Sequence, residues 1–200
     1  ETRAEANFTL AAGYKAKASG EQSTAVGFGS KSTGYGSNAI GSSSLAKGRH
    51  STAIGSSSLA EGDYSIALGQ EARTGANKNF ATALGYKSNA SGWSSFAQGA
   101  YAEASGGGSI AIGDSSKATT NDTIAIGTKA QATGSNSISI GKDNIVSGKN
   151  SAAIGNPSNI SGNNSYSLGN NNTIATDNTF VVGSGVTVNT AANTVNGNVI

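Results

Sequence analysis

A five-residue pattern of alternating large and small side chains, closed by a glycine, recurs between residues 9 and 183. In its clearest copy, Ser109–Gly113, a hydroxyl residue is followed by Ile, Ala, Ile and Gly. A period of two is typical of a β-strand whose two faces differ, so that one face accepts bulk and the other only a methyl or hydroxyl group. The residue just before the glycine is usually large and aliphatic, and in the clear copies it is Ile40, Ile54, Leu68, Leu84, Ile112, Ile126, Ile140, Ile154 or Leu168.

The closing glycines recur at a fixed spacing. They are Gly13, Gly27, Gly41, Gly55, Gly69, Gly85, Gly99, Gly113, Gly127, Gly141, Gly155, Gly169 and Gly183. Eleven of the twelve intervals are 14 residues long, and the interval from Gly69 to Gly85 is 16. A fixed short period of this kind is the signature of a solenoid.

A second glycine lies half-way along most repeats and follows a weaker Ser-x-Ala pattern, as in Ser44–Ala46 before Gly48. Each repeat is therefore predicted to form two short strands and two tight turns, and we attribute both glycines to the positive φ that such turns require. Thr120 and Thr176 replace the half-way glycine in two repeats, so that turn tolerates a side chain. The prediction is an all-β solenoid.

Stacked coils would place equivalent residues above one another at the spacing of paired strands. Side chains that recur at one repeat position then form columns, and amides in such a column can hydrogen-bond along the stack, as they do in cross-β assemblies. One such column is Asn136, Asn150, Asn164 and Asn178.

The composition fits a thin repetitive β-structure. Leu, Ile, Val and Phe make up only 33 of 200 residues, which is little for an ordinary globular core, and the net charge of +2 is small for a disordered chain. Two facing strands of so short a coil enclose little more than one layer of side chains. Since one apolar column is then left without a partner, we expect self-association with cyclic symmetry.

Several chemistries are disfavoured. The chain has no cysteine and a single histidine, His50, and its five aspartates form no repeating column of calcium ligands. It has no basic cluster that would favour nucleic acid and no apolar run of bilayer length. We therefore predict a protein without catalytic residues, cofactor or metal.

The Ser-x-Ala-Ile-Gly unit on its 14-residue period resembles the head repeat of trimeric autotransporter adhesins, the YadA-like head, over residues 8–183. The resemblance implies a single-stranded left-handed parallel β-roll of 14-residue coils, with three identical chains packed as a trimeric head. It also implies display on the outer surface of a Gram-negative bacterium. Heads of this family bind extracellular-matrix proteins, host receptors or each other, and are not enzymes.

On this resemblance, residues 1–183 form the head β-roll of about 13 coils, and residues 184–200 form the end of the head or the start of a neck. Attachment to the outer membrane is expected through a C-terminal anchor that lies outside this sequence. The large aliphatic residues before the anchor glycines are expected to form the trimer seam or the core.

Aromatic residues suggest where a partner binds, since ten of the twelve precede residue 102. Exposed aromatic side chains are favoured anchors in interfaces. The candidate receptor-binding residues are Tyr86, Trp93, Tyr101, Asn77, Lys78 and Tyr35. The alternative is that these rings cap the stack or fill a groove of the trimer.

The predicted function is that of a bacterial surface adhesin head that binds a host receptor or an extracellular-matrix protein through its outer surface. By family analogy, a CEACAM-type receptor and collagen are candidate partners. The alternative is a structural or autoaggregating spacer with no specific receptor.

Overall fold

The computed structural model describes residues 1–189, which fall into two compact units, Glu1–Ala102 (unit 1) and the described residues from Glu103 onward (unit 2). Within the described residues every regular element is a β-strand, and no helix is present that could cross a membrane. Each coil contributes one strand to each of two sheets, which we call sheet A (odd-numbered strands) and sheet B (even-numbered strands). The part of residues 184–200 that follows residue 189 lies outside the described residues.

Unit 1 contains seven strands in each sheet. Sheet A consists of β1 (Arg3–Ala4), β3 (Lys17–Ala18), β5 (Lys31–Ser32), β7 (Leu45–Ala46), β9 (Leu59–Ala60), β11 (Arg73–Thr74) and β13 (Asn89–Ala90). Sheet B consists of β2 (Leu10–Ala12), β4 (Thr24–Val26), β6 (Asn38–Ile40), β8 (Thr52–Ile54), β10 (Ile66–Leu68), β12 (Thr82–Leu84) and β14 (Phe96–Gln98).

Unit 2 repeats this arrangement. Its sheet A consists of β15 (Glu103–Ala104), β17 (Lys117–Ala118), β19 (Gln131–Ala132), β21 (Ile145–Val146), β23 (Ser158–Ile160), β25 (Asn172–Ile174) and β27 (Thr187–Val188). Its sheet B consists of β16 (Ile110–Ile112), β18 (Ile124–Ile126), β20 (Ile138–Ile140), β22 (Ala152–Ile154), β24 (Tyr166–Leu168) and β26 (Phe180–Val182).

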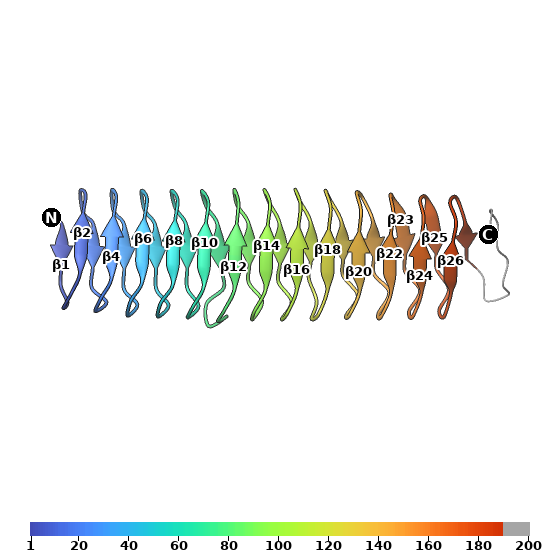
Figure 1. Ribbon diagram of the computed structural model, residues 1–200, viewed down its shortest axis with the longest axis horizontal. Helices are drawn as coiled ribbons and strands as arrows, with labels where there is room; N and C mark the ends of the chain where they lie inside the picture. The colour runs from blue at the N-terminus through green and yellow to red at the C-terminus, as the bar shows by residue number, and fades with distance from the viewer. Residues whose placement is uncertain (190–200) are drawn as a thin grey trace. The chain divides into compact units, whose positions relative to one another are not determined.

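Strands of one sheet pair in parallel with the strand one coil further on, and within each unit the coils lie side by side (Figure 1). Ile110 pairs with Ile124 and Ala111 with Ala125, an offset of one 14-residue repeat. Across the long interval Ile66 pairs with Thr82, so the two extra residues leave the register intact. The predicted all-β parallel solenoid of 14-residue coils is confirmed.

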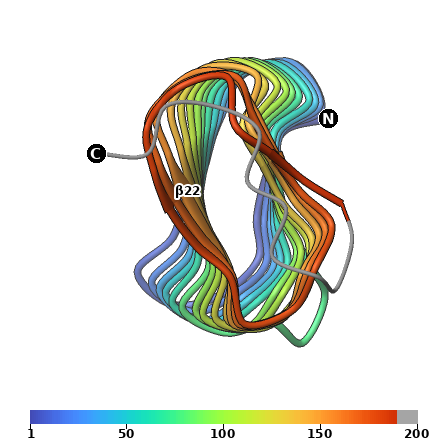
Figure 2. The same cartoon turned by 90° about the vertical axis from the view of Figure 1, so that its right-hand side faces the viewer.

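Small side chains fill the interior of each coil, whose two strands face each other when viewed end-on (Figure 2). Ala39 and Ala67 of sheet B and Ala46 of sheet A are fully buried. With strands this close, methyl and hydroxyl groups occupy the available width, which explains the low content of large apolar residues. The bulkier side chains of the pattern therefore point outward.

The large aliphatic residues before the closing glycines lie on the outer face of sheet B, where they are exposed or half-buried. The residues that were expected to form either the trimer seam or the core therefore lie on the surface of the single chain. These residues are Ile40, Ile54, Leu68, Leu84, Ile112, Ile126, Ile140, Ile154 and Leu168.

Buried hydroxyl groups close the turns, which accounts for the Ser or Thr that opens most copies of the pattern. Ser51 Oγ donates to the carbonyl oxygen of Gly48 at 2.7 Å, and Ser65 Oγ donates to that of Gly62 at 2.6 Å. On the opposite side of the coil Ser58 Oγ donates to the carbonyl oxygen of Gly55 at 3.0 Å. These bonds satisfy polar groups that would otherwise be costly to bury.

The interior of unit 2 becomes bulkier toward its later coils. In sheet A the inward position held by Ala118 and Ala132 is taken by Val146, Ile160 and Ile174 in the coils that follow. These side chains form an aliphatic core cluster with the neighbouring valines of the same unit. Hydrophobic burial is therefore larger in these coils than in the Ala- and Ser-lined ones.

The reason for the half-way glycines differs from the one that the sequence suggested. The closing glycines have positive φ, for example +130° at Gly41, as predicted. Gly48 and the other half-way glycines do not, and the positive φ of that turn belongs to the second residue after them, such as His50. Glycine is used there because a Cβ on Gly48 would lie 2.0 Å from the carbonyl oxygen of Gly62 in the next coil.

Candidate receptor-binding surface

Each coil presents two turns at opposite ends of its strands. The anchor turn begins at the closing glycine and leads from sheet B to sheet A, whereas the half-way turn leads from sheet A back to sheet B. The loop between β11 and β12, which contains the two-residue insertion, protrudes at the half-way-turn edge (Figure 1 and Figure 2). The two edges of unit 1 carry separate groups of aromatic side chains.

The half-way-turn edge of unit 1 carries a continuous row of five rings, which we call the aromatic ladder: Tyr35, His50, Tyr64, Phe80 and Trp93. The three central rings are stacked, with centroid distances of 5.2 Å between His50 and Tyr64 and 5.4 Å between Tyr64 and Phe80. At the two ends Tyr35 and Trp93 meet the stack edge-on.

Phe80 joins this row although the long interval separates it from Tyr64. The insertion is accommodated in the protruding loop, and the Phe80 amide still donates to the carbonyl oxygen of Asp63 at 3.0 Å. The planes of the Phe80 and Tyr64 rings differ by only 8°. The stack is therefore continued at the coil where the spacing changes.

Three of these rings belong to residues whose backbone conformation is energetically unfavourable. His50, Tyr64 and Phe80 have φ values of 52°, 55° and 62°, in the left-handed region that disfavours bulky residues. Such a conformation costs about 1–2 kcal/mol per residue, and an aromatic pair returns about 0.5–1.5 kcal/mol. In contrast, asparagine and glycine adopt this conformation readily, so stacking alone roughly offsets the strain and gives the fold little net benefit.

Unit 2 shows what the same column looks like without aromatic residues. Asn136 donates its Nδ2 to Asn150 Oδ1 at 3.0 Å, Asn150 donates to Asn164 at 3.2 Å, and Asn164 donates to Asn178 at 3.3 Å. All four residues have positive φ. The predicted amide column is confirmed, and it links the later half-way turns of unit 2, from Asn136 to Asn178.

Charges beside the aromatic ladder are paired within the chain. Arg49 Nη2 lies 2.8 Å from Asp63 Oδ2, and Lys47 forms an ion pair with Glu61. Hydrogen bonds from the backbone amide and the guanidinium of Arg49 hold the pKa of the Asp63 carboxyl below its usual value of 3.8. The edge consequently presents aromatic side chains among largely neutralised charges.

The anchor-turn edge of unit 1 carries two smaller aromatic pairs. Tyr14 stacks on Phe28 at 5.2 Å, and Tyr86 meets Tyr101 edge-on at 5.3 Å. Lys87 Nζ lies 5.1 Å from the centre of the Tyr86 ring. Hydrogen bonding to the Tyr86 side chain raises the pKa of the Tyr101 phenol above its usual 10.0.

The structure divides the six candidate receptor residues between the two edges. Tyr35, Asn77, Lys78 and Trp93 lie at the half-way-turn edge, whereas Tyr86 and Tyr101 lie at the anchor-turn edge. They therefore do not form the single patch that their closeness in sequence suggested. Whether either group binds a receptor stays a prediction.

Sequence reasoning missed that His50, Tyr64 and Phe80 complete the row. His50 lies in the coil between Gly36 and Tyr64, and its ring stacks on that of Tyr64. Phe80 was overlooked because the insertion shifts it by two residues from the regular period. Counting backward from Gly85 instead of forward from Gly69 would have found it.

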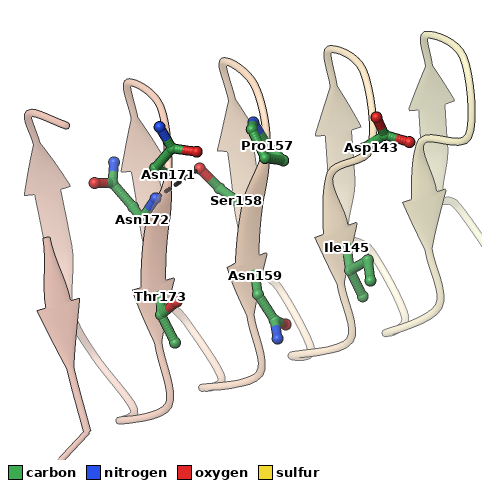
Figure 3. A pocket seen from close by; sticks show the side chains of 8 residues that line it. All are labelled: Asp143, Ile145, Pro157, Ser158, Asn159, Asn171, Asn172 and Thr173. Atoms are coloured by element: carbon green, nitrogen blue, oxygen red, sulfur yellow. Dashed lines mark hydrogen bonds between the residues drawn. The ribbon is translucent and has the colours of Figure 1, made fainter. Parts of the chain in front are cut away.

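A hollow of about 270 Å³ lies over β21, β23 and β25 of unit 2 (Figure 3). Six of its eight lining residues are polar, and Asp143 is the one titratable residue among them: Asp143, Ile145, Pro157, Ser158, Asn159, Asn171, Asn172 and Thr173. Ser158 Oγ accepts from the Asn172 amide at 3.3 Å, so some of its polar groups are already used within the chain. Across residues 1–189, no cluster of three or more His, Cys, Asp or Glu residues could hold a metal ion.

The fold and its exposed edges define a parallel β-solenoid protein that presents repeated surface columns. The chain belongs to the YadA head family, because the model of the YadA head domain repeat matches residues 4–30, 18–44, 32–58, 46–72, 76–102, 104–130 and 132–156. The chain is therefore the head of an adhesin in the trimeric autotransporter family, which is not an enzyme family. Membership of this family implies a location at the bacterial surface.

One solved structure to which the chain is similar is the collagen-binding domain of the Yersinia adhesin YadA. The two share 18% sequence identity over 92% of this chain and 84% of that one, with a TM-score of 0.32. No curated protein sequence matches the chain.

Proposed function

We propose that this head assembles as a homotrimer and binds a host cell-surface protein or an extracellular-matrix protein through its outer surface. The observation that carries the proposal is the difference between the outer faces of the two sheets. One face carries an apolar row along each unit and needs a partner, whereas the other is mostly polar, although it includes Leu45, Leu59 and Ile145.

The outer face of sheet B carries two rows of large apolar side chains in unit 2. Ile110 and Ile112 are followed by Ile124 and Ile126 and then by Ile138 and Ile140. In unit 1 Leu68 still exposes 46% of its surface in the single chain. Contiguous apolar patches of this extent usually mark an interface between protein chains.

The outer face of sheet A has the opposite character. Its outward positions include Lys17 and Lys31 in unit 1 and Glu103, Lys117 and Gln131 in unit 2. Charged and amide side chains are favoured in contact with water. A trimer that buries sheet B against neighbouring copies would thus leave sheet A facing outward.

The exposed aromatic groups of unit 1 supply the chemistry for recognition. Trp93 exposes 56% of its surface and Tyr64 exposes 49%. Trp and Tyr are enriched among the residues that dominate interface energies. The candidate partners remain a CEACAM-type receptor and collagen, by analogy with the family.

For the ends of the chain we keep the domain prediction of a head over residues 1–183 and a transition to a neck over 184–200. Of the latter, residues 184–189 include β27, which pairs with β25, and residues 190–200 lie outside the described residues. We propose attachment to the outer membrane through C-terminal segments outside this sequence, as in the family.

The test is direct binding of the purified head to immobilised collagen, to the N-terminal domain of a CEACAM-type receptor and to cultured epithelial cells. The proposal predicts saturable binding to the cells and to at least one purified protein. A head that is folded and yet binds none of these surfaces would contradict receptor recognition and would favour the spacer.

A further inference from the structure

We infer that the aromatic ladder at the half-way-turn edge of unit 1 is the surface that contacts the host partner, and that it takes an uncharged, apolar patch on a folded protein. The inference rests on the proposed function, which it deepens by naming the surface and the chemistry of the partner.

The first argument comes from the backbone. In unit 2 the turn position of the ladder residues is held by Gly108 and Asp122 and then by an asparagine column from Asn136 onward, all in the left-handed conformation, so the turn does not require a ring. In unit 1 the same position carries His50, Tyr64 and Phe80, which adopt that conformation only with strain. Other non-glycine residues also have positive φ in such turns, for example Lys15, Glu71 and Lys129, so what distinguishes this column of unit 1 is the choice of rings and not the strain itself.

The aromatic ladder is also continuous from one coil to the next. Five rings from Tyr35 to Trp93 contact one another in succession, and the row continues at Phe80 although the coil there is two residues longer. The extra residues go into a loop that projects from the half-way-turn edge (Figure 2), the edge that also carries the rings. The result is an extended apolar strip bordered by a protruding loop that carries Lys78.

The charges at this edge argue against a polyanion. Lys47 is paired with Glu61 and Arg49 with Asp63 within the chain, so of these cations and Lys78 only Lys78 adds an uncompensated charge. Glycosaminoglycans and nucleic acids are bound through clusters of Lys and Arg that remain available to the ligand's anionic groups. This edge lacks the positive field that such ligands require.

Ring orientation argues against a partner that stacks flat on the aromatic residues, as a nucleobase does. The faces of the central rings are covered by one another, with interplanar angles of 18° and 8° between neighbours. Their edges are therefore what a partner meets. Edge-on aromatic contacts and apolar packing are characteristic of protein interfaces, and Trp, Tyr and Arg are the residues enriched in their energetic centres.

The experiment measures binding of the purified full head to cultured epithelial cells by flow cytometry. Cells are used untreated, after trypsin, after heparinase, and after removal of N-linked glycans. The variants are Tyr64→Asn, which copies the asparagine column, and Trp93→Ser, which copies Ser135 at the equivalent position of unit 2. Circular dichroism and solution mass are recorded for every protein.

The matched control is Tyr14→Ser. Tyr14 is also exposed and also stacks on an aromatic neighbour, but it lies at the anchor-turn edge, where Ser42 and Ser56 occupy the equivalent position in other coils. We expect Tyr64→Asn and Trp93→Ser each to weaken binding at least tenfold, with unchanged fold and mass, and Tyr14→Ser to bind like the wild type. Trypsin is expected to abolish binding, whereas heparinase and glycan removal are not.

Other outcomes overturn the inference. Wild-type binding that survives trypsin, or that is lost with heparinase or glycan removal, would assign the partner to another class. Ladder variants that bind like the wild type would remove the aromatic ladder from the contact, while the proposed function would stand. If Tyr64→Asn and Trp93→Ser disperse the trimer, the row belongs to a contact between chains, and absence of wild-type binding would refute both proposals.

Discussion

Asn136 donates its side-chain Nδ2 to the Oδ1 of Asn150 at 3.0 Å, although 14 residues separate the two in sequence. Asn150 in turn donates its Nδ2 to the Oδ1 of Asn164, and its backbone has a φ of 53°. One side chain therefore links three coils and also relieves the strain of a left-handed turn residue.

Replacement of Asn150 separates these two contributions. Asn150→Ala loses both amide bonds and places a Cβ in the left-handed region, so we expect a loss of about 2 kcal/mol in unfolding free energy. Asn150→Gly also loses the amide bonds, but glycine adopts the left-handed conformation without strain, so we expect about half the loss in unfolding free energy. Urea unfolding at one protein concentration measures both, and equal losses in the two variants would contradict the assignment.

The two classes of glycine should respond differently to a methyl group. Gly41 has a φ of +130°, and a Cβ there would lie 2.6 Å from the Gly55 carbonyl oxygen. We expect Gly41→Ala to cost about 3 kcal/mol. At Gly48 φ is not in the positive range, but a Cβ would lie 2.0 Å from the Gly62 carbonyl oxygen, so Gly48→Ala should cost at least as much, through steric overlap with the next coil and not through backbone strain. Thermal melts that rank the two variants in the reverse order would refute this distinction.

The Arg49–Asp63 pair predicts a pH dependence. Because the pKa of Asp63 is lower in the folded chain than its usual 3.8, the pair contributes stability above that value and loses it as the pH falls through the lower, folded pKa. Arg49→Ala should move the Asp63 pKa back toward its usual value, as measured by NMR titration of the carboxyl carbon. An unchanged Asp63 titration in this variant would mean that the guanidinium contributes nothing beyond the Arg49 backbone amide, which the variant retains.

Much of the fold could be predicted from the sequence because each coil repeats the same local pattern. The anchor glycines determined the coil length, and Ile110–Ile112 shows the alternation of a strand with two different faces. The pattern alone did not show which face is internal, since it is equally compatible with Ala111 pointing inward and with Ala111 pointing outward. Packing decides this point, because the two facing strands of most coils leave room for Ala and Ser, and only the later coils of unit 2 enclose Val and Ile.

The candidate surface was less predictable. Tyr86 and Trp93 are seven residues apart, and half a coil places them at opposite ends of the strands. The contact between Tyr64 and Phe80 depends on where the two inserted residues are accommodated, and this is decided by backbone packing between coils. Local sequence therefore indicated that these aromatic residues lie at turns but did not show which of them meet.

Assembly through sheet B can be tested with one charge. Ile54→Asp places a carboxylate on the outer apolar face of sheet B, whereas Leu59→Asp places the same group on the outer face of sheet A in the following strand. A buried unpaired carboxylate is strongly destabilising, so we expect Ile54→Asp to shift the head to monomers and Leu59→Asp to leave its mass unchanged. Sedimentation velocity distinguishes the two outcomes, and dissociation by Leu59→Asp alone would place the interface on the other sheet.

The most direct test of the account is the solution mass of the wild-type head by light scattering. Burial of the apolar outer face of sheet B between three copies predicts a particle of three times the 19.6 kDa of one chain. A stable, folded monomer over the whole accessible concentration range would contradict it, because that face would then be exposed to water without a partner.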